Sequence, residues 1–390
     1  MTERQRLISK YTQHLSRAID VKYRLHFLLH EKDSASRTML SGQLEDVIGE
    51  TGNESVRKAY NNAKQGCAAI AFGQHNKNKS NKLTKDIQES RFGMGNDKKD
   101  HKLAGSNQLH SLYLEDALRS FSKHIIEIRE KTGHVNYNDK MYRERTEINL
   151  ILGNYPEALS LAQKGNLSDM AFIAAITNGN FDVAKQYVKQ NCRSIVNGDQ
   201  DRNVIVSTFE KIYLIMFVLF ATSSSSEAKS ISDEIFGPSG FDLKDLRKWT
   251  DNFCQRNFTN FLADLSEMKK IFELSIYTYP VVEQLANAII QNIVVLHLFP
   301  LARCTISSLC ADLSLSSSDA ISFIQNGIRN QKLYGKLDLV ANTYNGDINI
   351  NNDHNQMKEY FNQVSTIRKN FEINLWIREY NATNRKKVSK

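Results

Sequence analysis

Two histidines stand one helical turn apart near the start of the chain, a spacing at which a helix can present two imidazoles to one metal ion. They are His26 and His30, in the run His26-Phe27-Leu28-Leu29-His30. In zinc proteases with this spacing, a glutamate follows the first histidine and acts as general base. Phe27 takes that position here, so we interpret the pair as ordinary histidines of a helix.

Other catalytic signatures do not occur in the sequence. Gly93-Met94-Gly95 lacks the third glycine and the preceding strand of a dinucleotide-binding turn, and there is no GxxxxGK[ST] phosphate loop. No His-x-His pair occurs, and no Ser/His/Asp or Cys/His arrangement follows from the spacing. We therefore predict a non-catalytic protein with no catalytic residue, no cofactor and no metal site. The cysteines are scattered without paired spacing: Cys67, Cys192, Cys254, Cys304 and Cys310.

Composition points to a helical, intracellular protein. Glycine and proline are few, at 18 and 4 of 390 residues, which favours helix. An odd number of cysteines suits a reducing compartment. The N-terminus lacks the apolar segment of a signal peptide, and the longest apolar run, Ile212 to Ala221, is too short to span a bilayer. We expect a soluble protein of the nucleus and cytoplasm that does not bind membranes.

The first hundred residues combine helices with a polar segment. Apolar spacing predicts one or two helices over Arg6–His30 and a further helix over Tyr60–Phe72. Gly73 to Ser106 lacks the apolar content that ordering requires, so we predict a flexible loop there. Residues 76–102 hold eight Lys or Arg against four Asp or Glu. Phe92 is their single aromatic residue, which favours a solvated linker over a nucleic-acid tether.

A local motif recurs in the next part of the chain. An apolar residue stands three positions before an alanine in Leu114-Glu115-Asp116-Ala117, Tyr155-Pro156-Glu157-Ala158 and Phe181-Asp182-Val183-Ala184. The intervals of 41 and 26 residues bracket the tetratricopeptide period, which predicts irregular helix-hairpin repeats. The small residue would let paired helices approach closely.

A buried helix and several amphipathic helices follow. Val204 to Ala221 is apolar on nearly every face, as in a helix surrounded by protein. Further helices are predicted over Glu227–Phe236, Asp242–Phe253, Arg256–Lys270 and Val281–Leu298.

Pro300 to Asp347 has the pattern of a winged helix. Thr305 is a predicted N-cap for a helix that carries Ile306, Leu309, Cys310 and Leu313, and Ser316 to Asp319 cap a second helix. The inner face of the second helix is Ile321, Ile324 and Ile328. From Leu333 the apolar period changes to two, which predicts a strand over Tyr334–Val340. We place a hairpin turn at Asn345-Gly346, with Ile348 and Ile350 on the returning strand.

The C-terminal segment predicts one more amphipathic helix. We expect its apolar face to pack against a partner helix, and a basic tail follows. The residues of this face, which we call the seam, are Met357, Phe361, Val364, Phe371 and Leu375.

The order of these elements resembles the PCI family, named for the proteasome lid, the signalosome and translation initiation factor three. Within that family, the similarity is greatest to subunit 1 of the constitutive photomorphogenesis (COP) signalosome. That subunit enters its winged helix through Tyr-Phe-Ser-Pro, and here Leu298-Phe299 stands directly before Pro300. Other matching segments are Asp242–Leu246, Asn260–Leu265 and Tyr279-Pro280.

The resemblance implies a scaffold role in a complex that removes a ubiquitin-like modifier from cullins. Implied partners are other PCI subunits, the metalloprotease subunit of the signalosome, and a cullin-RING ligase as substrate. The corresponding subunit of the proteasome lid is the alternative. The departures are a short N-terminal region and the basic insertion, which indicate a divergent, fungal-type version.

The winged helix also raises a second alternative, nucleic-acid binding. Arg329, Lys332 and Lys336 are countered by Asp319, Asp338 and Asp347, a poor mixture for a polyanion, so nucleic acid is not expected. The favoured role is pairing through the exposed strand edge, with Tyr334, Lys336, Leu337 and Leu339 at the interface. A strand covered within its own hairpin would exclude that role.

The resulting domain organisation has seven parts. They are an N-terminal helical region (1–72), a flexible basic loop (73–108), TPR-like repeats forming an α-solenoid (109–200), a PCI helical subdomain (201–300), a winged helix (301–350), a C-terminal amphipathic helix (352–382) and a basic tail (383–390).

Overall fold

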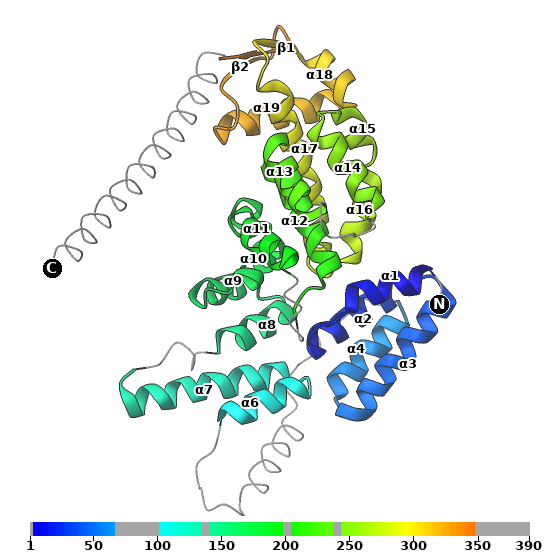
Figure 1. Ribbon diagram of the computed structural model, residues 1–390, viewed down its shortest axis with the longest axis vertical. Helices are drawn as coiled ribbons and strands as arrows, with labels where there is room; N and C mark the ends of the chain where they lie inside the picture. Colours follow the sequence, from blue (N-terminus) through cyan, green and yellow to red (C-terminus); the bar gives the residue numbers. More distant parts are fainter. Residues whose placement is uncertain (1–2, 67–100, 135–140, 198–203, 237–242, 348–390) are drawn as a thin grey trace, which may run out of the picture. The chain divides into compact units, whose positions relative to one another are not determined.

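The computed structural model describes residues 3–66, 101–134, 141–197, 204–236 and 243–347 (Figure 1). These residues form eighteen α-helices and one three-stranded antiparallel sheet, which confirms the predicted mainly helical fold. The chain divides into two compact units, Met1–Ile290 and Gln291–Lys390.

Four helices open the first unit: α1 (Glu3–Thr12), α2 (Arg17–His30), α3 (Ser34–Thr51) and α4 (Glu54–Lys64). Of the one or two helices expected before His30, the structure has two, whereas α3 was not predicted. The next helix was misplaced, because α4 begins at Glu54 rather than Tyr60. The Asn53 side chain caps α4 by accepting a 2.9 Å hydrogen bond from the Ser55 N–H, a local signal that apolar periodicity does not detect. Residues 67–72 lie outside the described part.

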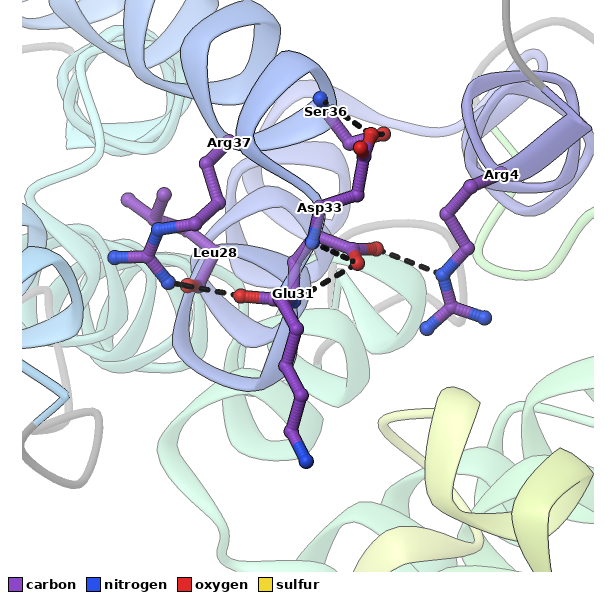
Figure 2. Close-up of polar contacts among 7 residues, drawn as sticks. Arg4, Leu28, Glu31, Asp33, Ser36 and Arg37 are labelled. Atoms are coloured by element: carbon purple, nitrogen blue, oxygen red, sulfur yellow. Dashed lines mark hydrogen bonds and ion pairs between the residues drawn. The ribbon is translucent and has the colours of Figure 1, made fainter.

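Ionic and backbone contacts around Glu31 hold the N-terminal helices together (Figure 2). The Arg4 guanidinium on α1 donates to the Glu31 carboxylate at 2.7 Å. Arg37 on α3 donates to the carbonyls of Leu28 and Glu31, at the end of α2. Burial acts to raise the pKa of Glu31, but the Asp33 N–H and Arg4 hold it below its ordinary value. The ionised carboxylate is therefore the form that joins α1 to α2.

Three helical pairs follow: α6 (His101–His110) with α7 (Leu114–Thr132), α8 (Tyr142–Leu152) with α9 (Tyr155–Lys164), and α10 (Ser168–Thr177) with α11 (Phe181–Val196) (Figure 1). The helices α7 to α11 lie in the predicted repeat region, 109–200. The recurring motif marks the first turn of the second helix in each pair. Its alanines, Ala117, Ala158 and Ala184, are fully buried where the helices meet.

Part of the predicted flexible loop, 73–108, is helical. His101 to Gln108 belong to α6, so the loop prediction was wrong for these residues, and 73–100 lie outside the described part. The helix forms because α7 covers it. A Cβ on Gly105 would lie 2.5 Å from the Phe121 ring, so the glycine allows that ring to pack directly on the α6 backbone.

The predicted buried helix is α12 (Thr208–Thr222), in which every residue from Ile212 to Ala221 is buried. The helices α13 (Ser225–Phe236), α14 (Lys244–Cys254), α15 (Phe258–Ala263), α16 (Leu265–Leu274) and α17 (Val282–Leu298) follow, with a 3₁₀ turn at Tyr279–Val281 before α17. The single helix predicted over Arg256–Lys270 is two helices, because the chain breaks at Asp264.

Buried polar contacts join the N-terminal helices to the rest of the first unit. The Tyr23 hydroxyl donates to the Glu210 carboxylate at 2.5 Å, and the Ser275 hydroxyl donates to the same group. Ser16 donates to Glu147 on α8 at 2.5 Å, and the Lys22 ammonium donates to two carbonyls at the end of α8. Burial raises the pKa of Glu210 to about 7, against the lowering effect of its hydroxyl donors.

This raised pKa gives stability a defined pH dependence. Because folding favours protonated Glu210, its contribution is complete below the unfolded-state pKa of 4.5 and is lost as pH rises through about 7. Replacing Glu210 with glutamine keeps one side-chain oxygen as an acceptor for the Tyr23 and Ser275 hydroxyls and removes the titration. The free energy of unfolding of Glu210→Gln, relative to wild type, should rise by about 3 kcal/mol between about pH 5 and pH 8, measured by urea denaturation.

The exposed Glu283 offers a matched control, since Glu283→Gln makes the same chemical change on a side chain that is 74% exposed. Its stability should follow wild type across the same pH range. Parallel curves for Glu210→Gln and wild type would contradict the assignment of this pH dependence to Glu210.

Candidate subunit interface

The second unit contains a winged helix. Its elements are β1 (Arg303–Thr305), α18 (Ile306–Leu313), α19 (Ser317–Arg329), β2 (Gly335–Asp338) and β3 (Thr343–Gly346). The strand order is β1-β3-β2, with β3 in the centre. The predicted helix, turn, helix and hairpin are present. The strand β1 was not predicted, because it is too short to show an alternating pattern.

Both predicted N-caps position the helices of this module. The Thr305 hydroxyl accepts a 3.2 Å hydrogen bond from the Ser308 N–H and starts α18. Ser316 accepts from the Asp319 N–H at 3.1 Å and starts α19. Of the predicted inner face of α19, Ile324 is fully buried, whereas Ile321 and Ile328 are half-buried.

The hairpin turn lies earlier than predicted. Asn345 and Gly346 are in β3, and the chain reverses over Leu339–Asn342. The Asp338 carboxylate makes this turn by accepting 2.9 Å hydrogen bonds from the N–H groups of Val340 and Ala341. The strand predicted over Tyr334–Val340 is accordingly shorter, and Leu339 lies in the turn. Ile348 and Ile350 lie outside the described residues.

The strand position of Gly346 requires glycine, because the backbone of another segment passes close to it. A Cβ at this position would lie 2.4 Å from the Leu301 carbonyl oxygen. Gly335 has the same role in β2, since a Cβ there would lie 2.3 Å from the Asn345 carbonyl oxygen. Glycine at both positions allows the short strands to pair closely.

The register shows which backbone groups of β2 lack a strand partner. The Asp347 N–H donates to the Tyr334 carbonyl at 2.8 Å, and Lys336 stands opposite Asn345. Antiparallel pairing alternates, so the backbone groups of Gly335 and Leu337 point away from β3. Among the described residues no strand pairs on that side. We call this row of groups the β2 edge.

The predicted interface residues lie along or beside the β2 edge. Lys336 is exposed, Tyr334 and Leu337 are half-buried, and Leu339 is 56% exposed in the turn. The predicted interface residues did not include Val340, which is 98% exposed beside Leu339. Two adjacent apolar residues after Asp338 were the available signal, and they were assigned to the strand. We call Leu339 and Val340 the wing tip.

A buried tyrosine holds the hairpin in place. Tyr344 on β3 is fully buried, and its hydroxyl donates to the Tyr334 carbonyl at 2.9 Å. Burial, with the Asp347 carboxylate nearby, raises the pKa of Tyr344, which keeps the hydroxyl protonated as a donor. The β2 edge is therefore presented by a strand that is fixed from one side.

The charges of the winged helix are balanced. Residues 301–347 contain four basic residues, Arg303, Arg329, Lys332 and Lys336, and four acidic ones, Asp312, Asp319, Asp338 and Asp347. On α19, the helix that would enter a DNA groove, Arg329 is the single basic side chain. Phosphate binding requires an excess of positive charge at such a surface.

The other predicted interface is not part of the described structure. Met357, Phe361, Val364, Phe371 and Leu375 lie in residues 348–390, outside the described residues. Their role in a C-terminal helix stays a prediction.

The histidine pair is not arranged for metal binding. His26 is buried, and its Nε2 lies 2.8 Å from the Glu273 carbonyl oxygen, a contact that requires a proton on that nitrogen. Burial lowers the pKa of His26 to about 4, despite the opposing effect of this hydrogen bond. In the described part of the chain, no three His, Cys, Asp or Glu residues could hold a metal ion together.

Comparison with known proteins identifies one region. Residues 254–343 match the family model of the PCI domain. This part of the chain is similar to a PCI domain. The match runs from the end of α14 to the start of β3 and includes the β2 edge and the wing tip. It supports membership of the PCI-domain family. No curated protein matches the chain.

One helical stretch within the PCI domain is long and apolar enough to cross a membrane, by length and composition alone. It covers Tyr279–Leu298, and half of its most apolar window is buried inside the protein. Leu285, Ile289, Ile293 and Val294 are almost fully buried, as in the core helix of a folded domain.

A prediction for the PCI domain concerns Gly335. Gly335→Ala places a Cβ against the Asn345 carbonyl, so β2 must move away from β3 at a cost of about 1–3 kcal/mol. Trypsin should then cut after the exposed Lys336 several times faster than in wild type, as followed by mass spectrometry.

Gly42 on α3 is the control, because nothing lies within 4 Å of a Cβ at that position. Gly42→Ala should leave cleavage after Lys336 unchanged. Equal cleavage of Gly335→Ala and wild type would show that the close approach at Gly335 does not fix the strand.

Proposed function

We propose that the chain is a non-catalytic scaffold subunit of the COP signalosome. PCI domains assemble with other PCI subunits in the signalosome, the proteasome lid and translation initiation factor three. The choice among these complexes rests on the resemblance of Asp242–Leu246, Asn260–Leu265 and Tyr279-Pro280 to signalosome subunit 1. The proposal places the chain in the nucleus and cytoplasm with the metalloprotease subunit, and with a cullin-RING ligase as substrate of the complex.

The observation that supports an assembly role most directly is the β2 edge. Gly335 and Leu337 present backbone donors and acceptors that a strand of another subunit can pair with. The wing tip, where Val340 is 98% exposed, adds an apolar contact at the end of the same strand. An edge and an adjoining apolar tip suit a protein partner, whereas the balanced charges do not suit a nucleic acid.

Purification of the tagged chain with mass spectrometry of its partners tests the proposal. We expect other PCI proteins together with a metalloprotease that carries a His-x-His motif. Recovery of proteasome lid subunits instead would replace the signalosome with the alternative complex. Tight, salt-sensitive DNA binding without protein partners would overturn the assembly role.

The wing tip gives a second test. Leu339→Asp with Val340→Asp places two charges on exposed side chains, so the fold should be retained while PCI partners are lost from the purification by tenfold or more, as expected when about 1.4 kcal/mol or more is lost from an interface.

Two other exposed residues provide its control. Ser318→Asp with Ser322→Asp adds the same charge to the outer face of α19. This control should keep its partners. Unchanged recovery with the wing-tip variant would remove the wing tip from the interface.

The C-terminal segment gives a third test. Deleting residues 352–390 removes the predicted seam, so the chain should leave its complex because the shared helical bundle is lost. Circular dichroism of the truncated chain should retain the helical signal of the described part. Unchanged co-purification would contradict a role for this segment in assembly.

A further inference from the structure

A groove of about 700 Å³ in the first unit is not part of the winged helix. It is lined by α1, the end of α2, α14 and α16. Apolar side chains line part of it: Leu7, Trp249, Ile271 and Leu274. A charged rim surrounds these side chains. We call it the α1–α16 groove.

Each basic side chain on the rim already has an acidic partner. Arg4 pairs with Glu31 at 2.7 Å (Figure 2). Lys248 pairs with Asp264 at 2.8 Å, and Lys270 pairs with Glu267 at 2.6 Å. The groove therefore has no uncommitted lysine or arginine among its described lining residues, and an acidic ligand would meet only neutralised cations.

Two carboxylates on the rim have no such partner. Asp245, in the first turn of α14, and Glu273, at the end of α16, are exposed and make no hydrogen bond or ion pair through their carboxylates to any described residue. After the three pairs are formed, the groove retains these two negative charges.

The ends of two helices add to this negative potential. His30 is the last residue of α2 and Leu274 is the last residue of α16, and both line the groove. The C-terminus of a helix carries a partial negative charge from its carbonyl groups. At the end of α2 the Arg37 guanidinium already counters these carbonyl groups, so a positively charged ligand is favoured mainly by the end of α16 and by the two carboxylates.

An aromatic surface lies beside these charges. Tyr279 is 45% exposed, and its ring centroid lies 4.9 Å from those of His26 and His30. Burial lowers the pKa of both histidines, and for His30 it outweighs the raising effect of the Glu273 carboxylate, so both rings are neutral near pH 7 and do not repel a cation. The exposed ring of Tyr279 can stack with a planar cation.

We propose that the α1–α16 groove binds an arginine side chain of a partner protein, between Asp245, Glu273 and the ring of Tyr279. A guanidinium can stack on tyrosine while donating to two carboxylates, which a lysine ammonium does less well. The apolar side chains of the groove would contact the residues next to that arginine. A metal ion does not fit, because the described residues offer no group of three ligands. This proposal holds whichever complex the PCI domain joins.

Trp249 supplies a direct readout. The sequence has two tryptophans, Trp249 in the groove and Trp376, so Trp376→Phe leaves Trp249 as the single tryptophan, which can be excited apart from the tyrosines. Acetylated tri-arginine amide should change its fluorescence saturably, tri-lysine should bind several-fold more weakly, and tri-glutamate should not bind. In this background Glu273→Gln and Asp245→Asn should each weaken tri-arginine binding about fivefold, the effect of losing one exposed charge pair.

Two further variants make the result specific. Tyr279→Ala should remove the preference for arginine over lysine. Glu50→Gln, which neutralises a carboxylate paired with Arg17 outside the groove, should bind as the parent does. No saturable signal, an equal response to tri-glutamate, or unchanged binding by the two groove variants would overturn the proposal. So would binding that appears only after residues 383–390 are deleted, because the basic tail of the chain would then be the occupant.

Discussion

The β2 strand pairs with β3 on one side and with no described strand on the other, and the proposed function depends on this asymmetry. Backbone amides and carbonyls form hydrogen bonds wherever water is excluded, so a row of unpaired groups stays at the surface or meets another chain. The β2 edge keeps its position because Tyr344 and two closely packed glycines fix the strand from the inner side. The unpaired backbone groups of β2 and the packing behind them together form a rigid surface for another strand.

In the first unit, by contrast, several buried polar groups are paired inside the protein. Glu210 receives hydroxyl donors from Tyr23 and Ser275, and Glu147 receives one from Ser16. These contacts link segments that are far apart in sequence, and they fix the N-terminal helices on α8 and α12. They are independent of the winged helix, so changes in the first unit can be separated experimentally from changes at the β2 edge.

Periodicity predicted the helical fold, the repeat helices from α7 to α11 and both helices of the winged helix, because each has a strong apolar pattern or an N-cap in its own sequence. It failed where distant contacts decide the structure. α6 is ordered by Phe121 packing on Gly105, and β1 is a strand because β3 lies beside it. Asn345-Gly346 is a strong turn dipeptide, but the close approach of Leu301 requires a glycine in the strand, and the Asp338 carboxylate makes the turn instead. The predicted interface residues lie along or beside β2 because the strand was recognised, and their role stays a prediction. The α1–α16 groove was missed because its side chains come from several helices.

The most direct test of the account is hydrogen–deuterium exchange, resolved to single residues, on the free chain and on the complex purified with it. The amides of Gly335 and Leu337 point away from β3, so they should exchange quickly in the free chain and slowly in the complex. The amide of Lys336, already paired with β3, should change little. Equally fast exchange of Gly335 and Leu337 in both states would contradict assembly through the β2 edge.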